Sequence, residues 1–281
     1  MIYVLLSVVC SVLVSVLLKL ARRFQFDIGQ AVAWNYVVAA ALAALVLKPS
    51  LTPLRHVGVP WFALIALGVL LPTIFLALGA SVRHAGIVRS DAAERLSLVI
   101  SLAGAFLLFG QRFDAPIVAG CAMGIAAMAG MIWRPGRRGV DEGHARWAYP
   151  LLVFVGFGVI DLLFKRVAAA GVSLGPALLA VFVLALVIAF AIEFARRTRF
   201  GIRGLAAGVM LGLLNFGNIL FYLRAHRALP HNPALVFAST SLGVVALGAV
   251  AGFVLFHERL GHINRAGLGA ALVAVALLTY G

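Results

Sequence analysis

Ten apolar runs follow one another along this chain of 281 residues. The runs are 2–20, 30–47, 60–81, 91–110, 115–133, 148–168, 175–195, 205–223, 233–256 and 265–280. A helix that crosses a bilayer needs about 20 apolar residues. Hydrophobic residues make up 64% of the chain, whereas soluble domains are about half apolar. We therefore expect an all-α integral membrane protein with ten transmembrane helices.

A repeated stretch divides these helices into two sets of five. Residues 253–267 (FVLFHERLGHINRAG) match residues 106–120 (FLLFGQRFDAPIVAG) at six of fifteen positions, with Arg112 paired to Arg259. Repeats of this kind indicate that a chain is built from duplicated units. Because each copy has an odd number of spans, the second copy should enter the membrane upside down, as in many alternating-access transporters.

The repeat also sets the expected domain organisation. Lys19 matches Lys165 at nearly the same separation, and charge is rare in these runs. We expect a first five-helix repeat at 1–133, a connecting loop at 134–147, and a second, inverted five-helix repeat at 148–281. The loop is rich in charge and glycine.

The net charge of +14 indicates a membrane partner rather than nucleic acid. Lys and Arg flank the apolar runs, where they set topology and contact lipid headgroups. Most of them fall in connectors that follow the odd-numbered runs, which predicts that both termini lie outside the cell. The N-terminal run lacks a basic leader and a clear cleavage site, so we expect it to be retained.

The chain resembles the EamA-type branch of the drug/metabolite transporter superfamily. The motifs that carry the likeness are FHERLG (256–261) followed by AGLGAALVAVALL (266–278), and FGQRFDAP (109–116) followed by AGCAMGIAAMAGM (119–131). The resemblance implies two inverted five-helix repeats and the export or exchange of metabolites such as amino acids or nucleobases. It also implies cytoplasmic termini, against the charge count. Gln111 stands where the second copy has Glu258, which is a departure from the repeat.

Three charged residues precede the short apolar part of the fourth run. Leu96–Gly110 is too short to cross alone, so Asp91, Glu94 and Arg95 should lie in the first turns of this span. Asp91 and Arg95 are four residues apart and can pair, which leaves Glu94 as the preferred candidate. A carboxylate in apolar surroundings favours its protonated form and can carry a proton. The alternative is a salt bridge that caps the helix.

Asp161 is a second acid expected inside the membrane. The apolar run before it, 148–160, is too short to span. Lys165 follows four residues later and can neutralise Asp161 in a structural pair. The equivalent position in the first repeat is Ser15, and this asymmetry slightly favours a functional role for Asp161.

A polar face occurs in the eighth run, where Asn215, Asn218 and Tyr222 share one side of a helix. Two amides and a phenol can orient a polar solute, or they can bond neighbouring helices together. Trp34 and Asn35 form a weaker candidate of the same kind.

Proline and glycine in the runs suggest structural features. Pro72 should kink the third helix and free a carbonyl. Glycines at helical spacing should form packing faces. They are Gly204, Gly208 and Gly212 in one run, and Gly248 and Gly252 in another.

No metal or cofactor site is expected. In HERLGH (257–262) the second histidine, His262, is one residue late for the zinc-protease motif, because Gly261 occupies the required position. Glu258 is then expected to end the ninth span at the membrane interface. No nucleotide-binding segment is evident, so ATP is not expected as an energy source.

These features predict a secondary active transporter of a small organic solute, for which proton coupling is one option, rather than an enzyme. We expect it in the cell membrane, the inner membrane in a bacterium, as a monomer or homodimer. Glu94 and Asp161 are the candidates for handling protons or solute charge, and Lys19 and Lys165 for holding an anion or locking a gate. The alternatives are an intramembrane lipid-modifying enzyme and a structural membrane subunit.

Overall fold

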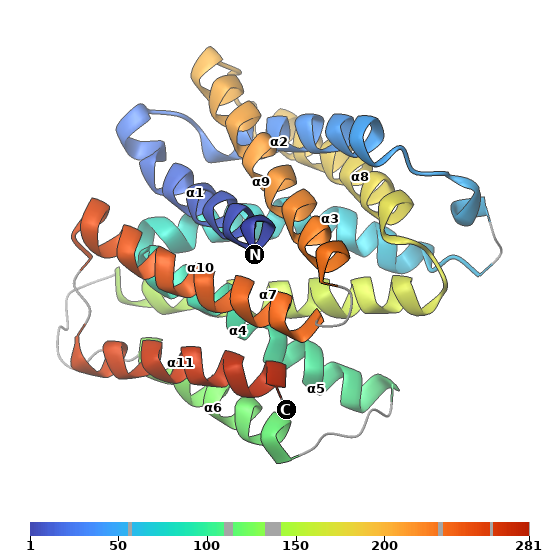
Figure 1. Cartoon of the computed structure of the whole chain (residues 1–281). Coiled ribbons are helices and arrows are strands. Elements are labelled where there is room, and N and C mark those ends of the chain that lie inside the picture. The colour runs from blue at the N-terminus through green and yellow to red at the C-terminus, as the bar shows by residue number, and fades with distance from the viewer. Residues whose placement is uncertain (56–57, 110–114, 133–141, 230–232, 259–260, 281) are drawn as a thin grey trace. The chain divides into compact units, whose positions relative to one another are not determined.

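A computed structural model (Figure 1) describes residues 1–55, 58–109, 115–132, 142–229, 233–258 and 261–280. Within these ranges the regular elements are helices, and no strand occurs. The helices are α1 (Ile2–Phe24), α2 (Ile28–Leu42), η1 (Ala43–Leu47), η2 (Thr52–Arg55), α3 (Trp61–Ala85), α4 (Ile87–Leu96), α5 (Leu98–Phe109), α6 (Ala115–Ile132), α7 (Glu142–Ala169), α8 (Leu174–Ala195), α9 (Ile202–Ala228), α10 (Pro233–Phe256) and α11 (His262–Tyr280). The all-α class is confirmed for the described residues.

Seven of the described helices are long and apolar enough to cross a membrane. They are α1, α2 continued by η1, α3, α7, α8, α9 and α10. Apolar segments of α6 and α11 are shorter, at Val118–Gly130 and His262–Leu278. All ten predicted runs contain helix, and the structure supports a multi-pass membrane protein at this coarser level.

The fourth predicted run, 91–110, is divided between two helices. α4 ends at Leu96 and α5 begins at Leu98. At the break, the Ser97 hydroxyl donates to the carbonyl oxygen of Glu94 (2.5 Å). The break itself was not expected from the sequence, where a single span was predicted.

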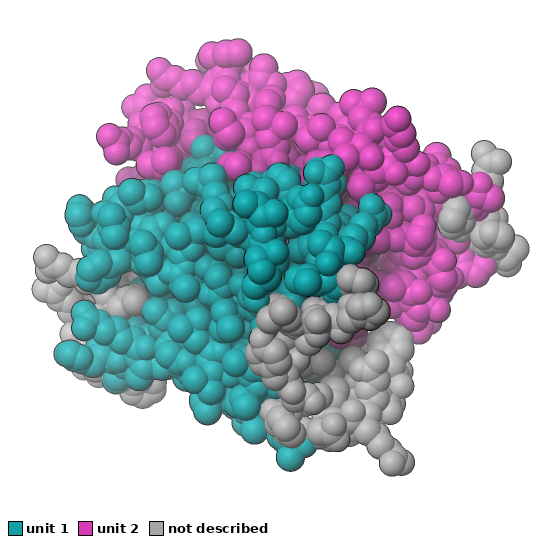
Figure 2. Space-filling view, viewed as in Figure 1, with its two compact units in different colours: residues 1–19, 77–158, 217–281 teal, residues 20–76, 159–216 magenta. Residues whose placement is uncertain are grey.

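The described chain forms two compact units, which Figure 2 colours separately. Unit 1 comprises residues 1–19, 77–158 and 217–281. Unit 2 comprises residues 20–76 and 159–216. Each unit therefore takes segments from both halves of the sequence, and the halves are interleaved rather than folded apart.

Several repeat positions fall outside the described residues. Gln111, Arg112 and Arg259 are among them, as is most of the predicted connecting loop. α7 begins at Glu142, inside the range predicted for that loop. The division of the chain into repeats at 1–133 and 148–281 stays a prediction.

Glycines on α9 provide a packing face in unit 2. The contacts pair Gly204 with Gln30, Gly208 with Trp34, and Gly212 with Val38 of α2. At each position a methyl group would meet the α2 side chain too closely to fit without movement. The predicted packing role of these three glycines is confirmed.

Two of the glycine contacts in unit 2 resemble each other and lie at nearly the separation of the predicted repeat. A Cβ at Gly212 would lie 2.6 Å from the Cβ of Val38, and a Cβ at Gly68 would lie 2.6 Å from the Cβ of Leu184. Gly212 follows Gly68 by 144 residues, and Leu184 follows Val38 by 146. Each half therefore supplies a glycine to the other half in the same way.

Pro72 lies inside α3, which continues as one helix on both sides of it. The Thr73 hydroxyl donates to the carbonyl oxygens of Val69 (3.0 Å) and Leu70 (2.9 Å). Side-chain hydroxyls commonly satisfy carbonyls beside a proline in membrane helices. α3 therefore runs through Pro72 without a break.

The core of unit 1 brings α1, α4 and α10 together. An apolar cluster joins α1, α9 and α10 through Val4, Val8, Val12, Ala225, Val236, Val244 and Ala251. α10 also packs on α4, and α6 packs on α11. These contacts hold one face of α1 in place within unit 1.

Candidate functional site

Four polar residues form a stripe along α1. Ser7, Ser11, Ser15 and Lys19 are spaced four residues apart, so they lie on one face of the helix. The three serines are buried. Each residue of the stripe bonds to a partner in unit 1, and these partners come from α3, α4, α9 and the end of α10.

The most buried acid of unit 1 lies beside this stripe. The Ser15 hydroxyl donates to Oδ1 of Asp91 at 2.5 Å, and Asp91 is only 2% exposed. Its second oxygen, Oδ2, has no hydrogen-bond partner among the described residues. Gly248 of α10 faces Oδ2 so closely that an added methyl group would collide with it.

Arg95 pairs with a different acid from the one predicted. Its guanidinium lies 3.1 Å from Glu94 and donates to the Ser11 hydroxyl at 2.9 Å. The expected Asp91–Arg95 pair is therefore not the one formed, because Arg95 is turned toward Glu94 and α1. The reason for preferring Glu94 over Asp91 as the uncompensated acid thus fails.

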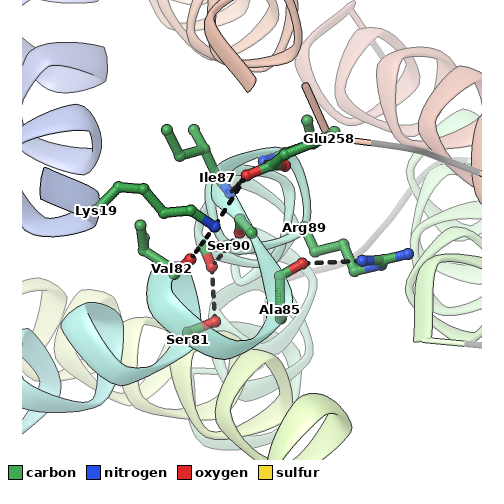
Figure 3. A network of polar contacts seen from close by, with 10 residues as sticks. Lys19, Ser81, Val82, Ala85, Ile87, Arg89, Ser90 and Glu258 are labelled. Carbon is green, nitrogen blue, oxygen red and sulfur yellow. Dashed lines mark hydrogen bonds and ion pairs between the residues drawn. The ribbon is translucent and has the colours of Figure 1, made fainter. Parts of the chain in front are cut away.

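Lys19 completes the stripe by meeting the start of α4 (Figure 3). Its amino group lies 3.3 Å from Glu258 and donates to the carbonyl oxygen of Val82 at 2.9 Å. Glu258 also accepts the backbone N–H of Ile87 (2.8 Å) and Val88 (3.4 Å). A carboxylate at a helix N-terminus is favoured by the helix dipole and by these free amides. Glu258 therefore caps α4, a role that the sequence did not suggest.

The backbone before α4 suits this cap. Gly86 has a φ of 97°, a conformation that glycine adopts at little cost. A Cβ there would lie 2.5 Å from Oε2 of Glu258. Glycine thus allows both the turn and the close approach of the carboxylate.

Further polar contacts join the start of α4 to α3 and α11. They involve two serine hydroxyls and an arginine. Ser81 and Ser90 share a hydrogen bond of 2.7 Å. Arg89 donates to the carbonyl oxygen of Ala85 and to Asn264 (3.0 Å), and Figure 3 shows its bond to Ala85. Asn264 in turn donates to a carbonyl of α6. The contacts of Asn264 were missed because its partners Arg89 and Gly130 are far from it in the sequence.

The predicted polar face of α9 is divided between the units. Asn218, in unit 1, accepts from the Ser7 hydroxyl at 2.7 Å. Asn215, in unit 2, donates to Asn35 at 3.2 Å. Tyr222, in unit 1, packs its ring edge-on against His226. The two amides thus bond to other helices, which is the alternative role that the sequence left open.

Asp161 and Lys165 both lie on α7 in unit 2 and are partly buried. Asp161 acts electrostatically on Lys165, in line with the expected interaction of the pair. Both residues have partners in the structure. The pair thus belongs to a different unit from Lys19, Asp91 and Glu94.

Unit 2 contains a second buried acid that the sequence reasoning passed over. Glu193 of α8 is 1% exposed, and its Oε1 lies 3.0 Å from Arg196. The Arg196 side chain is 52% exposed. Tyr36, on α2, is fully buried, and its hydroxyl has no hydrogen-bond partner among the described residues. The described residues include no group of acids, histidines or cysteines arranged to hold a metal ion.

Together, the fold and this stripe define an all-helical protein with membrane-length helices and a line of buried polar and charged groups. No family model matches the chain. It is 37% identical over 282 residues to a Haemophilus influenzae protein described as uncharacterized, covering 98% of this chain and 96% of that protein. The chain belongs to the same family as this protein.

A solved crystal structure, whose description gives no function, resembles the fold. The TM-score is 0.58 over 97% of this chain and 94% of that chain. The sequence identity is 16%, so the likeness concerns the fold alone.

Proposed function

We propose that the protein is a secondary active transporter that moves a small organic solute across a cell membrane by alternating access. The observation that carries this proposal is the polar stripe along α1, which ends at Lys19 and whose Ser15 bonds the buried Asp91 of α4. An ionisable residue in a membrane span costs about 2.5–3.5 kcal/mol on insertion scales and is usually functional. Such residues mark solute and proton pathways in transporters.

The broken fourth span also favours transport. Transporter solute sites are commonly formed where a spanning helix is discontinuous, and α4 and α5 are separated at Ser97. The start of α4, with Lys19 and Glu258, presents helix amides and charge at one point. This arrangement suits a gate or a site for a charged solute.

The duplication supports the same proposal. Both units combine the two halves of the sequence, and the Gly68 and Gly212 contacts repeat between the halves. We infer that the halves are inverted relative to each other in the membrane, as the EamA-type resemblance implies. In a bacterium the membrane is the inner one, and the resemblance suggests a metabolite such as an amino acid or nucleobase as solute.

The proposed solute contacts follow from these placements. Lys19 holds an anionic group or locks the gate through Glu258. Asp161 and Lys165 are the proposed groups for solute charge, and Asn215, Asn218 and Tyr222 are the proposed orienting groups. Release of Asn215 or Asn218 from its present partner would expose an amide to the solute.

Uptake into liposomes containing the purified protein tests this function. A panel of amino acids, nucleobases and related metabolites is offered with and without a pH gradient. We expect saturable movement of one class of solute, slowed in Asp161→Asn and Glu94→Gln, and unchanged in Lys48→Gln, because Lys48 is exposed. The proposal fails if no panel member moves in either direction through correctly inserted protein. Chemical change of the vesicle lipids would instead indicate the enzyme alternative.

A further inference from the structure

Asp91 is a buried carboxyl group without a matching cation. Of its two oxygens, Oδ1 accepts one neutral hydroxyl, that of Ser15, and Oδ2 has no hydrogen-bond partner among the described residues. Leaving a charged carboxylate in such a place is costly, because a buried charge needs a partner or must be neutralised. The geometry therefore favours an uncharged Asp91 in this conformation.

The charged groups around Asp91 are already engaged or are acids. On its own helix, Arg95 is turned to Glu94 and Ser11. From beyond α10, Glu258 acts on Asp91 and is itself paired with Lys19 of α1. α10 presents Gly248 to Oδ2. Neither cation is bound to Asp91. Arg95, one helical turn away, favours a negative charge on Asp91, whereas Glu94 and Glu258 both disfavour it.

The close approach of α10 limits what can bind at Oδ2. A single methyl group on Gly248 would collide with this oxygen, so an amine of an organic solute has no room here. A hard metal cation takes six or more oxygen ligands, whereas the described contacts offer Asp91 and Ser15. A proton needs neither space nor further ligands.

We infer that Asp91 is the coupling site of the proposed transporter and that its ligand is a proton; the inference rests on the proposed function. The proton binds the free Oδ2, turning the carboxylate into a carboxylic acid, and the Ser15 hydroxyl continues to donate to Oδ1. Loss of this proton leaves one negative charge on Asp91.

Arg95 is the cation that would respond to the negative charge left on Asp91. Its Nε is buried and has no hydrogen-bond acceptor among the described residues, and it lies one helical turn from Asp91. Proton release attracts Arg95 from Glu94 toward Asp91, a pair that its spacing of four residues permits. Arg95 thus binds Glu94 when Asp91 is protonated and Asp91 when it is not. The exchange also changes the contact between Arg95 of α4 and Ser11 of α1.

Labelling with dicyclohexylcarbodiimide, which adds to protonated carboxyl groups in apolar surroundings, tests the site without measuring transport. The full chain in liposomes is labelled from mildly acidic to mildly alkaline pH, and each acid is quantified by mass spectrometry. We expect labelling of Asp91 that falls as the pH rises. Glu193 is the matched control: it is equally buried but paired with Arg196, and should stay unlabelled.

Variants then connect this site to transport. Ser15→Ala should extend the labelling of Asp91 to higher pH, because the Ser15 hydrogen bond favours the charged carboxylate. Asp91→Asn should lose accumulation driven by a pH gradient while retaining exchange of solute at equal pH. A sodium gradient is applied in parallel.

The outcomes separate the two proposals. Asp91 that resists labelling at every pH, or labels equally at all of them, overturns the proton site even if Asp91→Asn fails to fold. Proton-driven accumulation by Asp91→Asn, or sodium-driven accumulation by the wild type, overturns it as well. If Asp91 is labelled as expected but the protein moves no solute, the proton site is supported and the proposed transport function is wrong.

Discussion

Unit 1 and unit 2 each bury a carboxylate, but they satisfy it differently. Asp91 in unit 1 is held by a serine and keeps one oxygen without a partner among the described residues. Glu193 in unit 2 also keeps one oxygen, Oε2, without a partner among the described residues, but its Oε1 bonds an arginine whose side chain is half exposed. An acid paired with a partly solvated cation is stable in its charged form, whereas an acid facing only a hydroxyl is poised to take up a proton.

The contacts that hold the helices together also differ between the two units. In unit 1, the start of α4 is capped by the charged Glu258, which is paired with Lys19, and α10 approaches α4 closely at Gly248 and Gly252. In unit 2, α2 is fixed by close glycine contacts and by aromatic rings, such as Trp34 against Phe190 at 5.4 Å. The start of α4 in unit 1 is therefore held by charged groups as well as by close packing, whereas the contacts described for α2 in unit 2 are mainly packing contacts and one amide pair.

The largest expected effect comes from breaking the charged contact of unit 1. Lys19→Met removes the cation that faces Glu258, and loss of one partner from a mostly buried pair costs on the order of 3 kcal/mol. The free energy of unfolding, measured in micelles by titration with a denaturing detergent, checks this value. Lys19→Arg should recover part of the loss. An equal effect from Arg22→Met, at an exposed position of α1, would show that the pair contributes nothing particular.

A smaller loss should follow from disturbing the packing of unit 2. Gly208→Ala forces a methyl group against Trp34 and against the α2 backbone at Ala31, which cannot turn aside as a side chain can. Overpacking of this kind costs about 1–3 kcal/mol. Gly269→Ala on α11 is the control, because nothing lies within 4 Å of its Cβ. The same unfolding titration should show no loss for the control, and equal losses in both variants would contradict the packing argument.

The smallest effect should come from the amide pair of unit 2. Asn215→Ala removes the hydrogen bond to Asn35, and interhelical hydrogen bonds in membrane proteins average about 0.6 kcal/mol. A double-mutant cycle with Asn35→Ala measures the coupling directly. A coupling energy as large as that of Lys19 with Glu258 would remove the distinction between the units.

Hydropathy was sufficient to predict the helices, because each apolar run needs a helix to satisfy its backbone in lipid. The shortness of Leu96–Gly110 predicted that Asp91, Glu94 and Arg95 lie in the first turns of the same span, whereas the structure places them on α4, a helix separate from α5. The break at Ser97 could not be predicted, since serine is tolerated within helices and no proline or glycine marks the position.

The site was less accessible from the sequence. The spacing of Ser7, Ser11, Ser15 and Lys19 is visible in the sequence and could have identified the stripe. Its partners could not be identified, because Ser15 and Asp91 are 76 positions apart and nothing local links them. The spacing of four residues instead suggested a pair between Asp91 and Arg95. In the structure both residues bond serines of α1, and Arg95 pairs with Glu94.

The cap on α4 has a consequence for how the protein is made. Glu258 emerges from the ribosome long after Lys19 and the N-terminus of α4, and at about 5–20 residues per second the delay reaches tens of seconds. During that interval the start of α4 lacks the acceptor for its Ile87 and Val88 amides, and Lys19 lacks its carboxylate partner. Unit 1 can complete its folding only after its last segment has been synthesised. A chain truncated before Glu258 should therefore be degraded by membrane proteases faster than the full chain.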